Sequence, residues 1–253
     1  MTMDQDQSEF KNQTLTDHLS ELRTRIVHSL WAVLVTTATA FNFAEQIFNF
    51  IRQPIQPYLP QGGLIYTGPL DKFMAFVKLS VVVGIIAACP IWLWQIWKFV
   101  APGLYKKEKG IAFGFISSGT VLFLSGVSFA YWVVLPMAFK FLMTFGGDTD
   151  KPMIAIESYL SFVSQITLMF GLCFEMPLII TTLSMLGLVS RKFLSEKRRY
   201  AVLIIAIVSA IVTPPDLLSM SMMMVPMILL YEISIIVVWM IERKRAQQQR
   251  HAE

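Results

Sequence analysis

Two carboxylates of this chain stand on surfaces that are otherwise basic. Glu21 is followed by Arg23 and Arg25 at the start of the first apolar stretch, and Glu108 lies within the basic segment 106–109. An acid in such surroundings can serve as a docking group for a cationic partner. A second interpretation of Glu21 stays open, because Arg25 follows it by one helical turn and can pair with it.

A third carboxylate, Glu175, lies in an apolar run long enough to cross a membrane. An ionisable residue there costs about 2.5–3.5 kcal/mol on insertion scales, and it marks a pathway, a proton site or a polar partner. The alternative is a hydrogen bond between helices of the same bundle. Asp216 follows two prolines directly, which predicts that it caps the N-terminus of the last helix.

Other chemistry is missing from the sequence. Cys89 and Cys173 lie in apolar runs without CxxC spacing, and the three histidines are not clustered. We therefore expect no disulfide, no metal site and no cofactor. No HExxH, GxSxG or Walker A motif is present, so the chain is not expected to be an enzyme.

Composition indicates the class of protein that must position these acids. The 253 residues are 55% hydrophobic and 15% charged, with a mean hydropathy of +0.58, which is typical of a polytopic membrane protein. The apolar residues come in blocks, and about 20 of them cross a bilayer as a helix. We therefore expect an all-α bundle. The polar segment 1–16 does not resemble a signal sequence.

Six membrane-spanning helices are predicted, and the last two are expected to be short. The fifth has about 13 residues and reaches only about 20 Å, so this end of the protein should perturb the membrane. The third should stop near Pro136, and the sixth should be broken at Pro226. The six spans are 26–44, 73–97, 111–135, 159–188, 200–212 and 217–240.

The spans divide the chain into an amphipathic N-terminal segment (1–25), a transmembrane domain (26–241) and a C-terminal tail (242–253). The loop after the first span should contain a short amphipathic helix at 44–51. In that helix we expect Ile47, Phe50 and Ile51 to turn inward.

The positions of Lys and Arg predict the orientation. Of the 21 basic residues, all but five fall on the side of the two termini. Because basic residues gather on the cytoplasmic side, both termini are expected in the cytoplasm. The pI of about 9.1 then reflects topology and gives no reason to expect nucleic-acid binding. The five exceptions are Arg52, Lys72, Lys78, Lys140 and Lys151.

Five motifs, in order, make the sequence similar to the TatC family, the polytopic subunit of the twin-arginine protein translocase, over essentially its whole length. The resemblance implies a cup-shaped receptor of six helices in the bacterial inner membrane. Such a receptor binds the Arg-Arg signal peptides of folded precursors for export driven by the proton motive force. The motifs are HLSELRTR at 18–25, FVAPGLYKKE at 99–108, SYLSF at 158–162, FGLCFEMP at 170–177 and TPPD at 213–216.

By motif position, the resemblance implies that Glu21 and Glu108 bind the paired guanidiniums of the signal peptide. Arg23 and Phe99 would shape the same surface. This agrees with the chemistry of the residues, because a guanidinium presents a planar fork that a carboxylate engages through two hydrogen bonds. A lysine ammonium offers only a point charge, which gives a reason for Arg-Arg over Lys-Lys.

The resemblance also implies small single-span partners of the TatA/TatB type, with membrane lipid around them and assembly into homo- and hetero-oligomers. Glu175 would receive a polar residue from a partner's helix. Met220 is the matching contact on the last helix, and it departs from the pattern because some relatives carry glutamine there. Pro54 and Asp216 would be supports on the far side.

A rival hypothesis is a secondary transporter for a small solute, with Glu175 as the proton-coupling acid. Such folds commonly show internal repeats, and the two halves of this chain show no convincing repeat. An intramembrane enzyme is a second alternative, which the missing nucleophile and metal motifs argue against.

Overall fold

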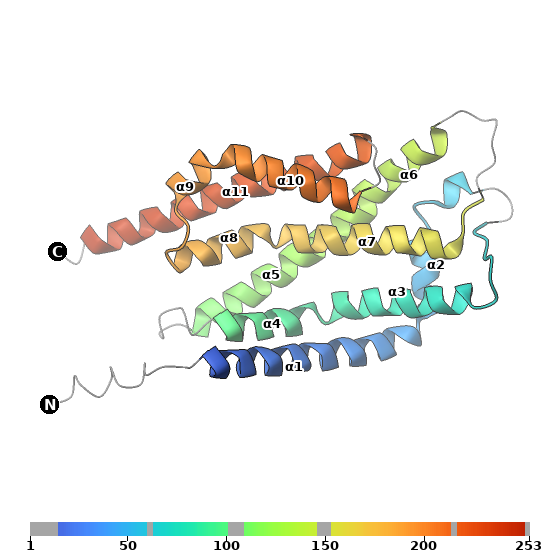
Figure 1. The fold of residues 1–253 in the computed structure, drawn as a ribbon, viewed down its shortest axis with the longest axis horizontal. Coiled ribbons are helices and arrows are strands. Elements are labelled where there is room, and N and C mark those ends of the chain that lie inside the picture. The colour runs from blue at the N-terminus through green and yellow to red at the C-terminus, as the bar shows by residue number, and fades with distance from the viewer. Residues whose placement is uncertain (1–14, 60–62, 101–108, 146–152, 214–216, 251–253) are drawn as a thin grey trace.

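The computed structural model describes residues 15–59, 63–100, 109–145, 153–213 and 217–250, in which the regular elements are helices and no strand is present (Figure 1). The predicted all-α class is confirmed. The α-helices are α1 (Leu15–Phe41), α2 (Ala44–Ile51), α3 (Asp71–Ala87), α4 (Cys89–Val100), α5 (Lys109–Phe129), α6 (Leu135–Thr144), α7 (Ile156–Phe174), α8 (Met176–Met185), α9 (Arg191–Glu196), α10 (Arg198–Val212) and α11 (Leu217–Arg250). A 3-10 turn, η2, covers Gln56–Tyr58, and a π-helical segment, η4, covers Ala130–Val134.

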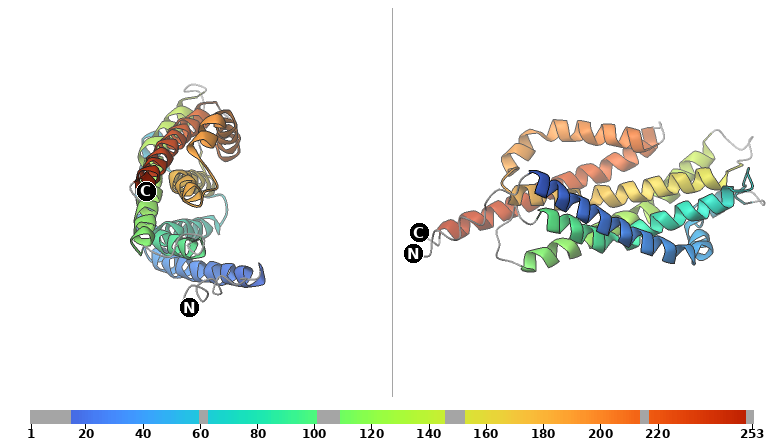
Figure 2. Two further views of the ribbon diagram at one scale, coloured as in Figure 1. Left: turned by 90° about the vertical axis from the view of Figure 1, so that its left-hand side faces the viewer. Right: turned by 60° about the horizontal axis from the view of Figure 1, so that its bottom comes forward.

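The helices form a curved wall that is open on one side, in agreement with the expected cup (Figure 2). The start of α1 and the end of α11 lie at the same end of the molecule (Figure 1). Both helices run without interruption through residues 25–26 and 241–242. The expected boundaries of the transmembrane domain therefore mark changes of composition within continuous helices.

Among the described residues, three helices are long and apolar enough to cross a membrane, and the number rises to five if each of two bent helix pairs is one span. The three are Phe113–Thr144, Ile156–Met185 and Met220–Lys244, and the bent pairs are Leu19–Phe41 with Ala44–Ile51 (84°) and Asp71–Ala87 with Cys89–Phe99 (54°). The remaining predicted span is α10, whose 15 residues reach about 22 Å, so the predicted short fifth helix is confirmed.

Two prolines do not end their helices, and both expectations about them were wrong. The third span passes Pro136 and continues to Thr144, because the π-helical turn before Pro136 absorbs the missing hydrogen bond. The last helix is neither broken at Pro226 nor short, since α11 is one helix of 34 residues. A single lost backbone bond is tolerated when the bonds on both sides persist and neighbouring helices pack against the site.

Short α10 is fastened to long α11 by polar contacts near its start. The Arg198 guanidinium donates to Glu232 Oε2 at 2.8 Å, with both side chains partly exposed. One turn before α10, the Tyr231 hydroxyl donates to the Leu194 carbonyl of α9 at 2.8 Å. These contacts fix how far α10 reaches along α11.

The predicted amphipathic helix is present as α2, but its inward face differs in part from the expected one. Phe48 is buried, and Ile47 and Ile51 pack partly buried against the core. Phe50, expected inside, is 48% exposed, because Phe48 takes the inward position two residues earlier. The ring of Phe50 instead stacks on Tyr131 with the centroids 4.6 Å apart.

The last carbonyls of α2 are satisfied by tyrosines from two other spans. Tyr131 donates its hydroxyl to the Phe50 carbonyl at 2.7 Å, and Tyr159 donates to the Ile51 carbonyl at 2.6 Å. The loops at this end are also joined by the bond from Ile156 N–H to the Ile65 carbonyl at 2.7 Å. The described loops at the end of the molecule far from α1's start are therefore joined to the helices and to each other by hydrogen bonds.

Close packing of α5 on α7 depends on Gly126. A Cβ built there would lie 2.5 Å from the Phe170 carbonyl oxygen and 2.9 Å from Phe174 Cβ. Phe170 is fully buried and its carbonyl belongs to the backbone of α7. The Phe170 carbonyl and the Phe174 Cβ therefore cannot move aside unless the two helices separate.

Gly126→Ala should therefore destabilise the folded protein by about 2 kcal/mol, the usual cost of overpacking a core. The measurement is the thermal unfolding midpoint of the purified protein in detergent. Gly114→Ala on the same helix is the matched control, since no atom lies within 4 Å of a Cβ there. Equal midpoints for the two variants would show that α5 and α7 are not packed this closely.

Candidate functional site

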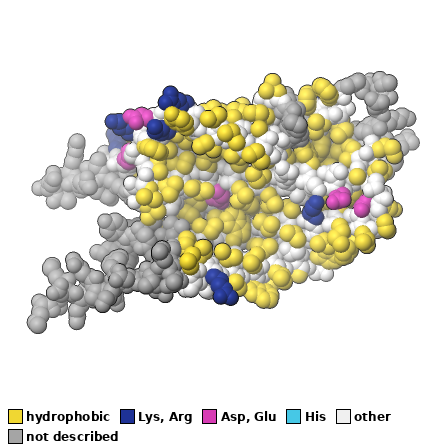
Figure 3. All heavy atoms as spheres, viewed as in Figure 1, with side chains coloured by type: hydrophobic (Ala, Val, Ile, Leu, Met, Phe, Trp, Pro, Cys, Tyr) yellow, Lys and Arg dark blue, Asp and Glu magenta, His cyan; other side chains and the backbone are white. Residues whose placement is uncertain are grey.

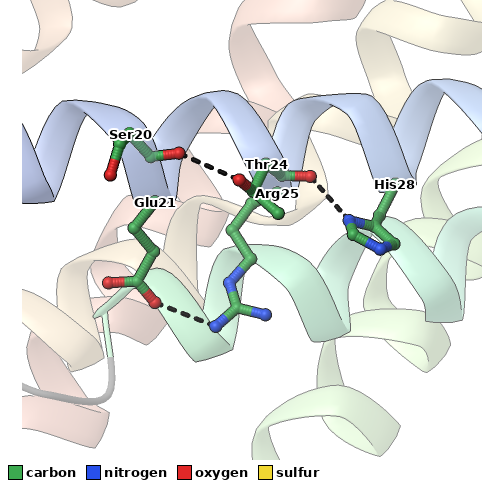
Figure 4. Close-up of polar contacts among 5 residues, drawn as sticks. All are labelled: Ser20, Glu21, Thr24, Arg25 and His28. Atoms are coloured by element: carbon green, nitrogen blue, oxygen red, sulfur yellow. Dashed lines mark hydrogen bonds and ion pairs between the residues drawn. The ribbon is translucent and has the colours of Figure 1, made fainter.

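Glu21 lies on the first turns of α1 and is already engaged by a guanidinium. Its Oε1 accepts from Arg25 Nη2 at 2.9 Å, and the two side chains are 25% and 27% exposed (Figure 4). The pairing follows from the four-residue spacing on a helix. The neighbouring hydroxyl of Thr24 donates to its own helix, to the Ser20 carbonyl at 3.0 Å. Glu21 is thus an acid that already receives a cation.

An apolar groove of about 540 Å³ begins beside this pair. Helix α1 contributes Leu22 and Arg25, and helix α4 contributes Trp92 and Phe99. Phe123 of α5 is fully buried at the groove and α7 supplies further lining. The polar side chains that line it are few, namely Arg25, Ser29 and Gln95. A groove of this size and lining accepts an apolar segment of a ligand, with a charged group held at its mouth.

The structure brings some of the predicted signal-peptide residues together and leaves others apart. Phe99 lines the groove with Arg25, and so reaches the neighbourhood of Glu21. Arg23 is exposed and is not part of the groove lining. Glu108 lies outside the described residues. Of the two acids predicted to bind the peptide, Glu21 is therefore the one whose surroundings the structure describes.

Glu175 occupies a break in the fourth span. It is the single residue between α7 and α8, where Pro177 removes a backbone N–H and interrupts the helix. The side chain is only 5% exposed, and its Oε2 faces Gly119, where a Cβ would lie 3.4 Å away. Neither carboxyl oxygen has a hydrogen-bond partner among the described residues. The interhelical hydrogen bond considered from the sequence is therefore absent from this part of the chain.

Other polar groups surround Glu175. Thr120, next to Gly119 on α5, has a buried hydroxyl beside the thiol of Cys89 on α4, and Cys89 is fully buried and close to Glu175 as well. A buried polar atom without a partner costs stability unless something else satisfies it. This cluster can accept a polar group from outside the chain.

Of the remaining predicted residues, Pro54 and Met220 do not line the groove. Pro54 is half-buried in the turn after α2, and Met220 is half-buried at the end of the first turn of α11. Asp216 lies outside the described residues. The face seen in Figure 1 is covered mainly by hydrophobic side chains, with most Lys, Arg, Asp and Glu toward its two ends and one acidic side chain visible between them (Figure 3).

The sequence did not reveal the groove, the place of Gln95 in it, or that Arg25 lines it as well as pairing with Glu21. Gln95 Oε1 is buried without a partner among the described residues, and so is Arg25 Nε. The helical spacing of Leu22, Arg25 and Ser29 places them on one face of α1, and this spacing is the local sign of the face that lines the groove. The matching face of α4 could not be assigned without knowing how the two helices pack.

Comparison with known proteins gives one consistent result. A family model described as "Sec-independent protein translocase protein (TatC)" matches residues 17–226. The protein of that name from Desulforapulum autotrophicum is 38% identical over 245 residues, which cover 96% of this chain and 91% of that protein. The one from Carboxydothermus hydrogenoformans is 37% identical over 243 residues, 96% of this chain and 99% of that protein.

A solved structure is also similar. The crystal structure described as that of the twin arginine translocase receptor TatC matches with a TM-score of 0.79 and 36% sequence identity. The match covers 88% of this chain and 98% of that chain.

Proposed function

This chain belongs to the TatC family, and from that membership together with the site geometry we propose that it is the signal-peptide receptor of a twin-arginine translocase. It is an all-helical, multi-pass membrane protein and a component of a Sec-independent protein translocase. The peptide it receives carries an Arg-Arg pair at the front of a folded precursor. We assign no catalytic reaction to it.

The observation that carries the proposal is the Glu21–Arg25 pair. A carboxylate at the mouth of an apolar groove already holds a guanidinium at 2.9 Å, with both groups largely withdrawn from water. In such a setting a charge-assisted hydrogen bond is stronger than at an open surface. The guanidinium of a signal peptide is the same group, so it fits where Arg25 now binds.

Glu108 is the second acid of the proposed site. In the sequence it follows Phe99 by nine residues, at the end of the segment that continues from α4. Two carboxylates match two guanidiniums in charge, and each can then form one two-pronged, charge-assisted contact. Phe99 would pack against the side chain of the peptide, and Arg23 would bound the surface at the solvent side.

Glu175 is the proposed contact for a small single-span partner of the TatA/TatB type. Its buried carboxyl group has no hydrogen-bond partner in the part of the chain that the structure describes, which supports this role, since a polar residue on a partner's helix would satisfy it. Met220 on α11 and the short α10 would extend the same contact. Because Glu175 is only 5% exposed, recruitment requires that the carboxyl group turn outward or that the partner displace the residues that cover it.

The proposed orientation has both termini in the cytoplasm of a bacterium, with the chain in the inner membrane and the proton motive force as the energy source. The basic residues of α9 and the end of α11 support it, because they lie at the same end of the molecule as the start of α1 (Figure 1). Pro54 and Asp216 then belong to the far side, where they would support the loops.

Arg25→Gln should strengthen binding of a twin-arginine peptide by about twofold to fivefold, because it removes the internal guanidinium that competes for Glu21. The measurement is a titration of the purified protein with a labelled signal peptide. Lys192→Gln removes one positive charge from the same end of the molecule and serves as the control. Weaker binding by Arg25→Gln would mean that Arg25 supports the peptide instead of competing with it.

Site-specific cross-linking in membranes tests the proposal as a whole. A photoreactive residue at Glu21 should cross-link to a twin-arginine precursor, and one at Glu175 should cross-link to the single-span partner. Addition of the precursor should increase the first product. If neither position formed a cross-link to the precursor, the receptor function would be refuted.

A further inference from the structure

Helix α3 carries an ammonium group well inside its span. Lys78 lies about 10 Å along the helix from Asp71, and its side chain is exposed. Its Nζ donates to the Ser161 hydroxyl of α7 at 2.8 Å, and Ser161 donates in turn to the Glu157 carbonyl at 2.7 Å. Lys78 takes part in no ion pair with another described residue. Two of its three N–H donors are therefore available to a ligand.

A second polar contact lies one turn deeper on α7. Gln165 donates its amide to the carbonyl of Val212, the last residue of α10, at 2.9 Å. The C-terminal end of α10 is thus held about 14 Å along α7 from Ile156. The last carbonyls of a helix need donors, and at this depth the exposed side chain of Gln165 supplies one.

The apolar groove begins further along the same two helices. Ile85 follows Lys78 by two turns on α3, and Leu168 follows Ser161 by two turns on α7, and both line the groove. Each helix therefore presents first a polar group and then, about 10 Å deeper, an apolar wall. The groove ends near Arg25 and Phe99 at the opposite end.

We propose that this assembly is a binding site for one phospholipid, with its phosphate on Lys78 and one acyl chain in the groove. The phosphate is drawn below the general level of the headgroups because the short α10 lets a polar surface descend to Gln165. A single anionic group joined to a long apolar chain matches a single exposed cation joined to a long apolar groove. The apolar part of a twin-arginine peptide is the competing occupant, but its basic end fits Glu21 at the other end.

The test uses the purified full-length protein in detergent micelles that contain phosphatidylglycerol brominated in the middle of its acyl chains. Bromine quenches tryptophan fluorescence at short range, and Trp92 lines the groove. In a variant that keeps Trp92 as its sole tryptophan, bromolipid should quench its emission, and Lys78→Gln should weaken the apparent affinity about fivefold. Lys78→Arg should retain the affinity. Lys72→Gln, the control near the start of the same helix, should leave it unchanged.

Native mass spectrometry of the protein with all its tryptophans gives a second readout that does not depend on the single-tryptophan variant. One phosphatidylglycerol should stay bound to the wild type and to Lys72→Gln, and be lost from Lys78→Gln. Equal retention and equal quenching for all three proteins would overturn the proposal. Loss of the lipid on addition of a twin-arginine peptide, with no effect of Lys78→Gln, would also overturn it and would assign the groove to the peptide.

Discussion

Replacing Glu21 and Glu108 together by glutamine will weaken binding of a twin-arginine signal peptide by about 100-fold. Each carboxylate is expected to supply one charge-assisted, two-pronged hydrogen bond to a guanidinium, and two such contacts account for this loss. Glutamine keeps the size of each side chain, and it leaves Arg25 without its ion-pair partner. The measurement is the dissociation constant of a labelled peptide for the purified protein in nanodiscs.

The control for this double variant is Glu196→Gln. Glu196 is an exposed acid on α9 near the same end, and its nearest cation is Lys192 at 4.0 Å. If that single change weakened peptide binding as much as the double change, binding would depend on net charge and not on a defined site. An unchanged affinity in the double variant would remove both acids from the receptor site.

Glu175→Ala is expected to weaken recruitment of the single-span partner about tenfold while twin-arginine peptide binding stays unchanged. The carboxyl group is the buried polar group of α7–α8 that lacks a partner within the described chain, so its removal deletes the proposed contact and leaves no new unsatisfied atom on this residue. Glu175→Gln should keep most of the recruitment, because an amide can still form hydrogen bonds in the same place. Co-purification of the partner with the receptor measures the effect.

Glu157→Ala, an exposed acid at the start of α7, is the matched control for that experiment. A folding defect would reduce partner recruitment and peptide binding together. Equal loss of both functions in Glu175→Ala, with Glu157→Ala unaffected, would therefore contradict a specific partner contact at Glu175.

The spans and their order could be predicted because apolar length depends on local sequence alone. A run such as that of α7 and α8 must be buried in lipid or protein whatever its neighbours are. The short α10 was predicted for the same reason, since Arg198 and Thr213 bound its 15 residues closely. The Glu21–Arg25 pair follows equally from local spacing, and it is present.

What the sequence could not predict depends on contacts between helices. Continuation of α11 through Pro226 relies on its neighbours, and the inward turn of Phe48 in place of Phe50 relies on the angle at which α2 meets α1. The groove is built from faces of five helices, so no single stretch encodes it. The bond from Gln165 to Val212 joins residues far apart in the chain, and polarity alone does not pair them.

In the proposed receptor, carboxylates at the mouth of the groove recognise guanidinium groups as planar forks. The most direct measurement is a comparison of one signal peptide with its Lys-Lys counterpart, titrated against the purified full-length protein under the same salt concentration. The Arg-Arg peptide should bind at least about tenfold more tightly, because lysine keeps the charge and loses the fork. Equal affinities for the two peptides would show that the site does not recognise the fork.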